Sequence, residues 1–244
     1  MKIALTAVLA VTPYLVHAGG SNYGIAPGSL TNFTGKVSEW PVPTPRFARD
    51  PAVAPDGSIF IAVMSGNKIA RFDTPTQTFR EWEMPAGHRP HGLLVDKQGM
   101  VWTTGNGNGT IGKLDPKTEQ MSEVDMGRSS RPRRVATAPD GMPWVANYGN
   151  GMLAKLDPAA MKVVKTYQLP GGDAGAYAVN TDGAGMVWVN EINLDTVVRF
   201  DPKTEHMRVV KLPSTNVGIR KMVVDAQGRL WYMGSHNGRL GVVE

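Results

Sequence analysis

Apolar and polar residues alternate along this chain in short runs that recur at a fixed interval. The stretch Glu81–Ser122 contains four apolar runs, around Trp82 and at 92–95, 100–103 and 110–114, and turn residues follow each run. The pattern largely repeats after about 42 residues. Four short strands joined by tight turns make one antiparallel sheet, and a recurrence of roughly 40 to 45 residues per sheet is typical of a propeller blade.

Five copies of this unit align on the turn that precedes the second apolar run. The turns are Asp56-Gly57, Gln98-Gly99, Asp140-Gly141, Asp182-Gly183 and Gln227-Gly228. A large ring follows at the same position in every copy, namely Phe60, Trp102, Trp144, Trp188 and Trp231. Because the sheets of a propeller stack face to face, we expect these rings to fill the core between blades.

The third strand of the first four copies carries a basic residue at its third place. These residues are Arg71, Lys113, Lys155 and Arg199. We interpret them as a solvated rim whose aliphatic stems lie on apolar neighbours, with a ligand surface as the alternative.

The fifth copy reaches Glu244 without an outer strand. At the other end, Val37–Pro43 matches Phe79–Pro85, which is an outer strand of the repeat. An N-terminal strand that completes the last blade hides exposed edges and locks the ring. The sequence therefore predicts an all-β fold, a five-bladed β-propeller of four-stranded blades whose ring is closed by this N-terminal outer strand.

The first residues have the features of an export signal. A basic start is followed by an apolar run of about 14 residues and by the short side chains of Val16-His17-Ala18. A membrane helix is the alternative, but a bilayer core requires about 20 apolar residues. We expect a signal peptide at 1–18, a flexible lead-in at 19–34 and the propeller domain at 35–244.

Composition narrows the location and the partners. The chain has no cysteine, and an exported protein without disulfides fits a bacterial periplasm or the cell exterior. Removing Lys2 with the leader takes the formal net charge from +5 to about +4. Because the basic residues are spread along the chain, we exclude nucleic acid as a partner and expect a small anionic ligand; after signal cleavage we expect no membrane span.

Candidate ligand-binding residues lie on the loops that crowd around the propeller axis. The loop entering the innermost strand contributes the residue eight positions before the turn glycine, which gives Arg49, His91, Arg133, Gly175 and Arg220. The loop leaving the second strand contributes Val63, Gly105, Asn147, Glu191 and Gly234. Tyr177 is a polar replacement close to Gly175, and we expect Tyr148, Asn106 and His236 near the same mouth.

Three arginines and a histidine at one structural position are expected to converge on a central channel. Like charges repel, so an anionic ligand that bridges the arginines explains the arrangement. The alternative is that the arginines splay into solvent or pair with carboxylates such as Asp50 and Glu191.

The repeats resemble those of the virginiamycin B (streptogramin B) lyases over Gly35–Glu244. The resemblance rests on RPHG at Arg89–Gly92, GTIGKL at Gly109–Leu114, WVNE at Trp188–Glu191 and the tryptophan in the second strand. Those lyases are seven-bladed propellers that open the ester of a cyclic depsipeptide by elimination with a magnesium ion, so the resemblance implies this chemistry, although the repeats of this chain count five blades. It also implies that His91 is the general base and that acids, here Glu191, help to hold the metal.

The chain departs from that family at several of these positions. The lyases have a second inner-loop histidine where this chain has Arg133, and acids where it has Arg89 and Gly105. One carboxylate, that of Glu191, is a poor cage for magnesium.

Two hypotheses follow. In the first, an exported lyase-like propeller binds an anionic or carbonyl-bearing small molecule at its axial face, with His91 as catalytic residue and Glu191 as metal ligand. The ligand-binding residues are then Arg49, Arg89, Arg133, Asn147, Tyr177, Arg220 and His236. In the second, the same face of a non-catalytic periplasmic sensor or scaffold docks a protein or peptide.

Overall fold

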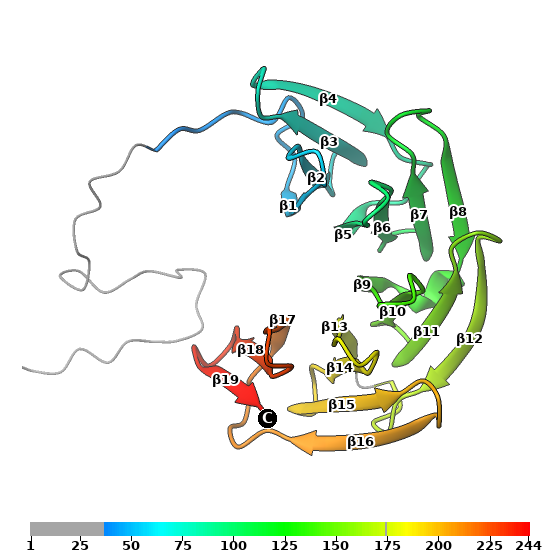
Figure 1. Cartoon of the computed structure of the whole chain (residues 1–244), viewed down its shortest axis with the longest axis vertical. Helices are drawn as coiled ribbons and strands as arrows, with labels where there is room; N and C mark the ends of the chain where they lie inside the picture. The colour runs from blue at the N-terminus through cyan, green and yellow to red at the C-terminus, as the bar shows by residue number, and fades with distance from the viewer. Residues whose placement is uncertain (1–36, 174) are drawn as a thin grey trace, which may run out of the picture.

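The chain folds into five antiparallel sheets. The computed structural model describes residues 37–173 and 175–244, and within them every regular element is a β-strand except a single 3₁₀ turn, η1 (Arg128–Ser130). The sheets follow one another around an arc (Figure 1). The all-β, five-bladed β-propeller expected from the repeats is confirmed.

Each blade is a meander that runs from the centre of the arc outward. The first blade is β1 (Ala48–Val53), β2 (Ile59–Val63), β3 (Lys68–Asp73) and β4 (Thr78–Glu83). The second is β5 (Pro90–Val95), β6 (Val101–Gly105), β7 (Thr110–Leu114) and β8 (Met121–Asp125). The third is β9 (Pro132–Thr137), β10 (Pro143–Asn147), β11 (Met152–Asp157) and β12 (Lys162–Gln168). The fourth is β13 (Ala176–Thr181), β14 (Val187–Glu191), β15 (Thr196–Asp201) and β16 (His206–Lys211), and the fifth is β17 (Ile219–Val224), β18 (Leu230–Gly234) and β19 (Leu240–Val243).

Apolar side chains between neighbouring blades form the core. Trp82 on β4 packs with Val101 and Leu114 of the second blade, and Trp102 packs with Val145 and Leu156 of the third. The rings expected to fill these spaces are buried in the first four blades, so that prediction is confirmed. The aromatic ring of the fifth blade, that of Trp231, is only half-buried.

Three of the core tryptophans are anchored by an aspartate six residues earlier. The indole N–H donates to that carboxylate at 2.8 Å, 3.0 Å and 2.7 Å in the pairs Trp102–Asp96, Trp188–Asp182 and Trp231–Asp225. The hydrogen bond from Trp231 is the main cause that lowers the pKa of Asp225 to about 2. In the third blade the corresponding residue is Ala138, and the buried Nε1 of Trp144 has no hydrogen-bond partner.

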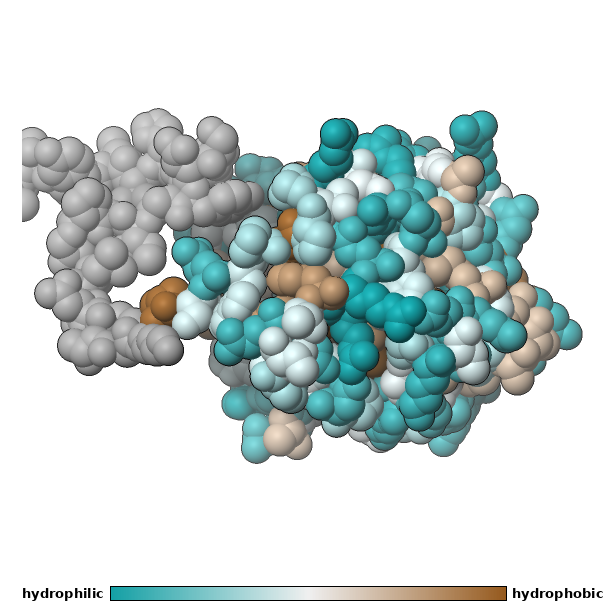
Figure 2. Space-filling view, turned by 90° about the horizontal axis from the view of Figure 1, so that it is seen from above, coloured by the Kyte–Doolittle hydropathy of each residue, from teal (hydrophilic) through white to brown (hydrophobic). Residues whose placement is uncertain are grey.

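The basic column on the third strands lies over these rings. The terminal cation lies 5.2 Å from the ring centroid for Lys113 over Trp102, and 5.5 Å for Arg199 over Trp188. The stems therefore cover the apolar edge of the blades as expected. Figure 2 shows one side of the molecule, where hydrophilic side chains predominate and apolar ones form small, separate patches.

The predicted ring closure is wrong. The fifth sheet has three strands among the described residues, and Val37–Pro43 forms no strand. Trp40 instead packs on Phe72 of the first blade, with ring centroids 4.9 Å apart, and its indole N–H donates to Gln77. Sequence similarity to an outer strand correctly marked this segment as blade-associated, but similarity does not say which sheet it joins.

Innermost strands of consecutive blades pack against one another from β1 to β17, whereas β17 and β1 make no comparable contact. The arc thus has two ends, at the first and the fifth blades (Figure 1). Among the described residues, no helix is long and apolar enough to cross a membrane.

Candidate functional site

Each of the five innermost strands is irregular at the same place. Pairing with the second strand shifts register at 49–50, 91–92, 133, 177–178 and 220–221. A bulge leaves residues unpaired and re-aims their side chains, and bulges are common at the rims of ring-shaped sheets. The repeat therefore redirects a side chain at one equivalent position of each innermost strand.

The fourth of these residues is Tyr177, not Gly175. In the fourth blade the turn glycine is Gly185. Its φ is 83° and its N–H donates to the carbonyl oxygen of Asp182, as in the other blades, whereas Gly183 has no positive φ. Two extra residues therefore precede this glycine, and counting back eight positions gives Tyr177. The five inner residues are Arg49, His91, Arg133, Tyr177 and Arg220.

His91 joins three consecutive blades. Its Nδ1 lies 3.1 Å from the carbonyl oxygen of Arg133, which only accepts, so Nδ1 carries the proton. Its Nε2 then accepts from the hydroxyl of Tyr177 at 3.3 Å. The ring is fully buried and uses both nitrogens.

Burial and positive charge keep this imidazole neutral. Desolvation is the largest cause, and the guanidinium groups of Arg49, Arg133 and Arg220 add to it, which lowers the pKa of His91 to about 3. All three guanidinium groups therefore lie close enough to His91 to disfavour its charged form, and the side chain of Arg220 is exposed.

Two of these arginines, Arg49 and Arg133, lie beside aromatic rings, whereas Arg220 is exposed. The guanidinium of Arg133 lies 4.6 Å from the ring centroid of Tyr148 and 5.5 Å from that of Tyr177, while that of Arg49 lies 5.4 Å from Phe47. Within the described part of the chain, Arg49, Arg133 and Arg220 form no ion pair. The buried Nε atoms of Arg49 and Arg133 have no hydrogen-bond partner there either.

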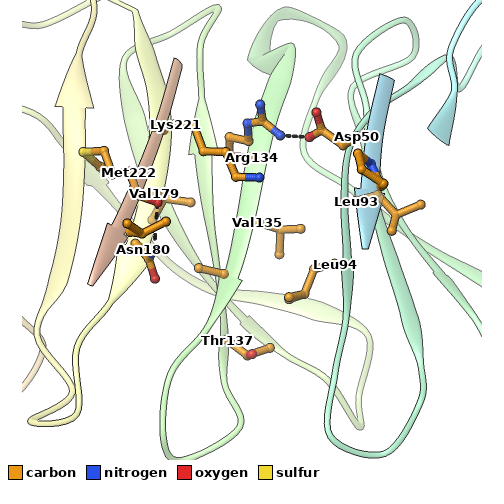
Figure 3. A pocket seen from close by; sticks show the side chains of 14 residues that line it. Asp50, Leu93, Leu94, Arg134, Val135, Thr137, Val179, Asn180, Lys221 and Met222 are labelled. Carbon is orange, nitrogen blue, oxygen red and sulfur yellow. Dashed lines mark hydrogen bonds and ion pairs between the residues drawn. The ribbon is translucent and has the colours of Figure 1, made fainter. Parts of the chain in front are cut away.

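A channel of about 270 Å³ runs between the innermost strands. Its wall includes Asp50, Arg134, Asn180 and Lys221, and Figure 3 shows the ion pair between Asp50 and Arg134 that crosses it. Burial lowers the pKa of Arg134. Sequence reasoning missed Arg134 and Lys221, although each directly follows an inner arginine and the period-2 alternation of a strand could have indicated them.

Comparison with solved structures identifies the architecture. A virginiamycin B lyase from Staphylococcus aureus superposes with a TM-score of 0.81 at 19% identity, covering 87% of this chain and 72% of the lyase. The chain has a virginiamycin B lyase-like β-propeller fold. A streptogramin B lyase gives a TM-score of 0.77 at 19% identity over 86% and 70% of the two chains, and Kuenenia stuttgartiensis hydrazine synthase gives 0.64 at 20% over 83% and 59%. No family model matches the sequence, and no curated protein matches it.

In this lyase-like propeller Glu191, the metal ligand expected from the sequence, has both carboxylate oxygens in hydrogen bonds to the protein. Glu191 is buried and accepts hydrogen bonds from the backbone N–H of Gly171 at 2.6 Å and from the hydroxyl of Thr196 at 2.8 Å. It pairs with neither Arg133 nor Arg220, contrary to the structural guess from sequence. No three acidic or histidine side chains of residues 37–173 and 175–244 gather as metal ligands, so these residues do not fit the magnesium site that the resemblance implies.

The remaining sequence candidates divide into two groups. Asn147 is buried at the end of β10 with an unpartnered Oδ1, and Tyr148 lies beside Arg133. Arg89 is exposed on a loop, where its backbone N–H donates to Asn67, and the Nδ1 of His236 lies 3.3 Å from Asn216. Neither contact of Arg89 or His236 involves the arginine cluster.

A second buried histidine, His88, was not predicted as a site residue. Its Nδ1 donates to the carboxylate of Glu123 at 2.9 Å and its Nε2 accepts from Thr103 at 2.8 Å. His88 and Thr103 are fully buried and burial lowers the pKa of His88. We interpret this network as structural support within the second blade, because each of its members is hydrogen-bonded.

Proposed function

We propose that this propeller binds a small carboxylate- or phosphate-bearing molecule at the end of its channel, between Arg49, Arg133 and Arg220. The observation that carries the proposal is that the buried Nε atoms of Arg49 and Arg133 have no hydrogen-bond partner among the described residues. Both arginines, like the exposed Arg220, stand at the bulge of an innermost strand and have no carboxylate partner there. A guanidinium presents a planar fork that matches carboxylate and phosphate oxygens, so an anion relieves the repulsion between these groups.

The aromatic contacts support binding by a preorganised site. Tyr148 and Tyr177 hold Arg133 in place, which reduces the side-chain entropy lost when an anion binds. The mild positive net charge expected for the mature protein also attracts anions over a longer range.

We propose binding without elimination chemistry. A general base works best with a pKa near the operating pH, and a pKa of about 3 makes His91 a weak base. The ring is also closed in by Arg133 and Tyr177, which occupy both nitrogens. The proposed binding involves no magnesium ion, because the residues present do not fit one.

We propose that binding takes place in the location expected from the sequence, a periplasm or the cell exterior. The predicted signal peptide and lead-in lie outside the described residues, so export to a periplasm or the exterior is part of the proposal. An exported protein that binds an anionic metabolite or a peptide carboxylate could act as a sensor or as a scavenger of that molecule.

Isothermal titration calorimetry with phosphate and citrate tests the binding. We expect saturable binding that weakens with added salt, and Arg133→Gln to weaken it by about 10-fold or more, because one charge-assisted pair is lost. Arg208→Gln is the matched control, since Arg208 is exposed on β16.

Absence of heat and of a thermal shift with either anion at millimolar concentration would refute the proposal. Equal affinities for wild type and Arg133→Gln would refute the site. A shift in Arg208→Gln as large as in Arg133→Gln would indicate nonspecific attraction by the net charge.

A further inference from the structure

The residue six positions before the core ring differs between blades. It is aspartate in the second, fourth and fifth blades, where its carboxylate accepts the hydrogen bond of the indole N–H. It is alanine in the first and third blades. A cavity of about 180 Å³ is lined by Ala54 and Phe60 in the first blade, and one of about 280 Å³ by Ala138 and Trp144 in the third. The short side chain of alanine therefore leaves room beside the ring, and we call these spaces the first-blade cavity and the third-blade cavity.

The third-blade cavity contains a buried donor without an acceptor. Trp144 is 1% exposed, and its Nε1 has no hydrogen-bond partner among the described residues. The indole N–H of the equivalent tryptophans points to the residue six positions earlier, which here is Ala138 on the cavity wall. A buried donor that lacks a partner is unfavourable, so a ligand that places an acceptor there gains affinity. The first-blade cavity lacks this feature, because the ring of Phe60 has no donor.

The acid on the cavity wall does not supply the missing acceptor. Asp140 is exposed, and its carboxylate accepts from the backbone N–H of Met142 at 3.0 Å rather than from the indole. Two lysines, Lys155 and Lys203, line the same cavity, and neither forms an ion pair among the residues that the structure describes. The ammonium group of Lys155 lies 5.6 Å from the centroid of the Trp144 ring. Two cations and one anion therefore line the cavity, and this balance favours one added negative charge.

Much of the remaining wall is apolar. Pro139, Met186 and Pro202 line the cavity together with the ring of Trp144. We propose that the third-blade cavity binds a small carboxylic acid with an apolar body. Its carboxylate takes the place of the missing aspartate: one oxygen accepts from the indole N–H, and the ammonium groups of the two lysines attract the charge. The apolar body packs on the ring and on the two prolines.

This site is separate from the proposed anion site. Strands β9 and β10 pair Asn147 with Pro132 at the end that carries the bulge, and Pro143 with Thr137 at the other end. The third-blade cavity adjoins the turn at 138–142, which joins the two strands at that other end. Failure of either proposal therefore leaves the other standing.

A titration followed by nuclear magnetic resonance tests the proposal. Benzoate is the probe, and the readout is the indole N–H signal of Trp144, which is assigned by its loss in Trp144→Phe. We expect benzoate to move this signal downfield in a saturable way with a Kd of about 1 mM or tighter, because the unpaired N–H gains a charged acceptor. Benzamide, which has the same ring without the charge, should bind at least about 5-fold more weakly.

Matched variants in the first and third blades locate the binding. Ala138→Asp provides the acceptor within the chain and should abolish the shift caused by benzoate, whereas Ala54→Asp makes the same change in the first-blade cavity and should leave binding unchanged. Lys203→Gln should weaken binding by about 2- to 3-fold, while Lys117→Gln should not, since Lys117 is the equivalent lysine of the first-blade cavity. Thermal unfolding checks that each variant is folded.

An unchanged Trp144 signal at about 20 mM benzoate would overturn the proposal and leave the cavity to solvent. Benzoate binding that persists in Ala138→Asp would overturn the location of the carboxylate. Equal affinities for benzamide and benzoate would overturn the chemical class of the ligand. A loss of binding in Lys117→Gln as large as in Lys203→Gln would assign the shift to nonspecific attraction by the net charge and overturn the site as well.

Discussion

Acidification should destabilise this protein through the buried imidazole of His91. Its pKa is lowered from 6.5 to about 3 in the folded chain, first by burial and then by the neighbouring arginines. Between these two values the unfolded chain takes up a proton on this ring and the folded chain does not. Stability therefore rises with pH across this window and is lost as the pH falls below 6.5.

The size of the effect follows from the two pKa values. For a single group, moving from pH 7.5 to pH 5.0 costs about 2 kcal/mol of unfolding free energy, since each unit below the unfolded pKa costs about 1.4 kcal/mol. His91→Gln removes the titrating group and keeps a donor for the carbonyl of Arg133. The variant should be less stable at pH 7.5 but lose about 2 kcal/mol less than wild type on acidification.

Urea unfolding followed by tryptophan fluorescence at pH 7.5, 6.5, 5.5 and 5.0 measures this difference. His88 is also buried with a lowered pKa, and it contributes equally to wild type and variant, so the difference between the two curves isolates His91. His206→Gln is the control, because His206 is exposed on β16. Parallel curves for wild type and His91→Gln would refute the inference that the imidazole is neutral and shielded.

Three further substitutions test the packing. Ala138→Asp should stabilise the protein by about 1 kcal/mol by giving the indole N–H of Trp144 an acceptor, and thermal unfolding should show no gain when Trp144→Phe is also present. Trp40→Ala should cost about 1 to 2 kcal/mol in the same assay, and no loss would mean that this segment does not cover the first blade. Asp50→Asn should cost about 2 kcal/mol because Arg134 keeps its charge in the channel wall, and Asp50→Asn with Arg134→Met should recover part of that loss.

The blades were predictable because several independent features of the sequence recur with the same period. Apolar runs of strand length, Asp-Gly and Gln-Gly turns and one large ring per unit all agree with a four-stranded sheet. The inner residues Arg49, His91, Arg133 and Arg220 could be placed by counting from the turn glycine, because a bulge occurs at the same point of each inner strand.

The errors have local physical causes. In the fourth copy Gly183 and Gly185 both follow Asp182, and only the backbone conformation identifies Gly185 as the turn residue. Glu191 was expected to face a metal or an arginine, but its partners are a loop amide and a threonine hydroxyl. Loop conformation determines those contacts, and strand periodicity carries no information about it.

The open arc does not remove the candidate site, although ring closure was expected to create it. His91, Arg133 and Tyr177 come from the second, third and fourth blades, which lie in the middle of the arc, and they contact one another directly. Neighbouring blades fix those contacts through their own buried interfaces, so the anion site requires only the blades on either side of it. Leu240→Lys should therefore leave phosphate and citrate binding unchanged, although it changes an exposed position of the fifth blade. If that substitution weakened anion binding as strongly as Arg133→Gln, the anion site would be coupled to the fifth blade, and the separation between the site and the ends of the arc would be wrong.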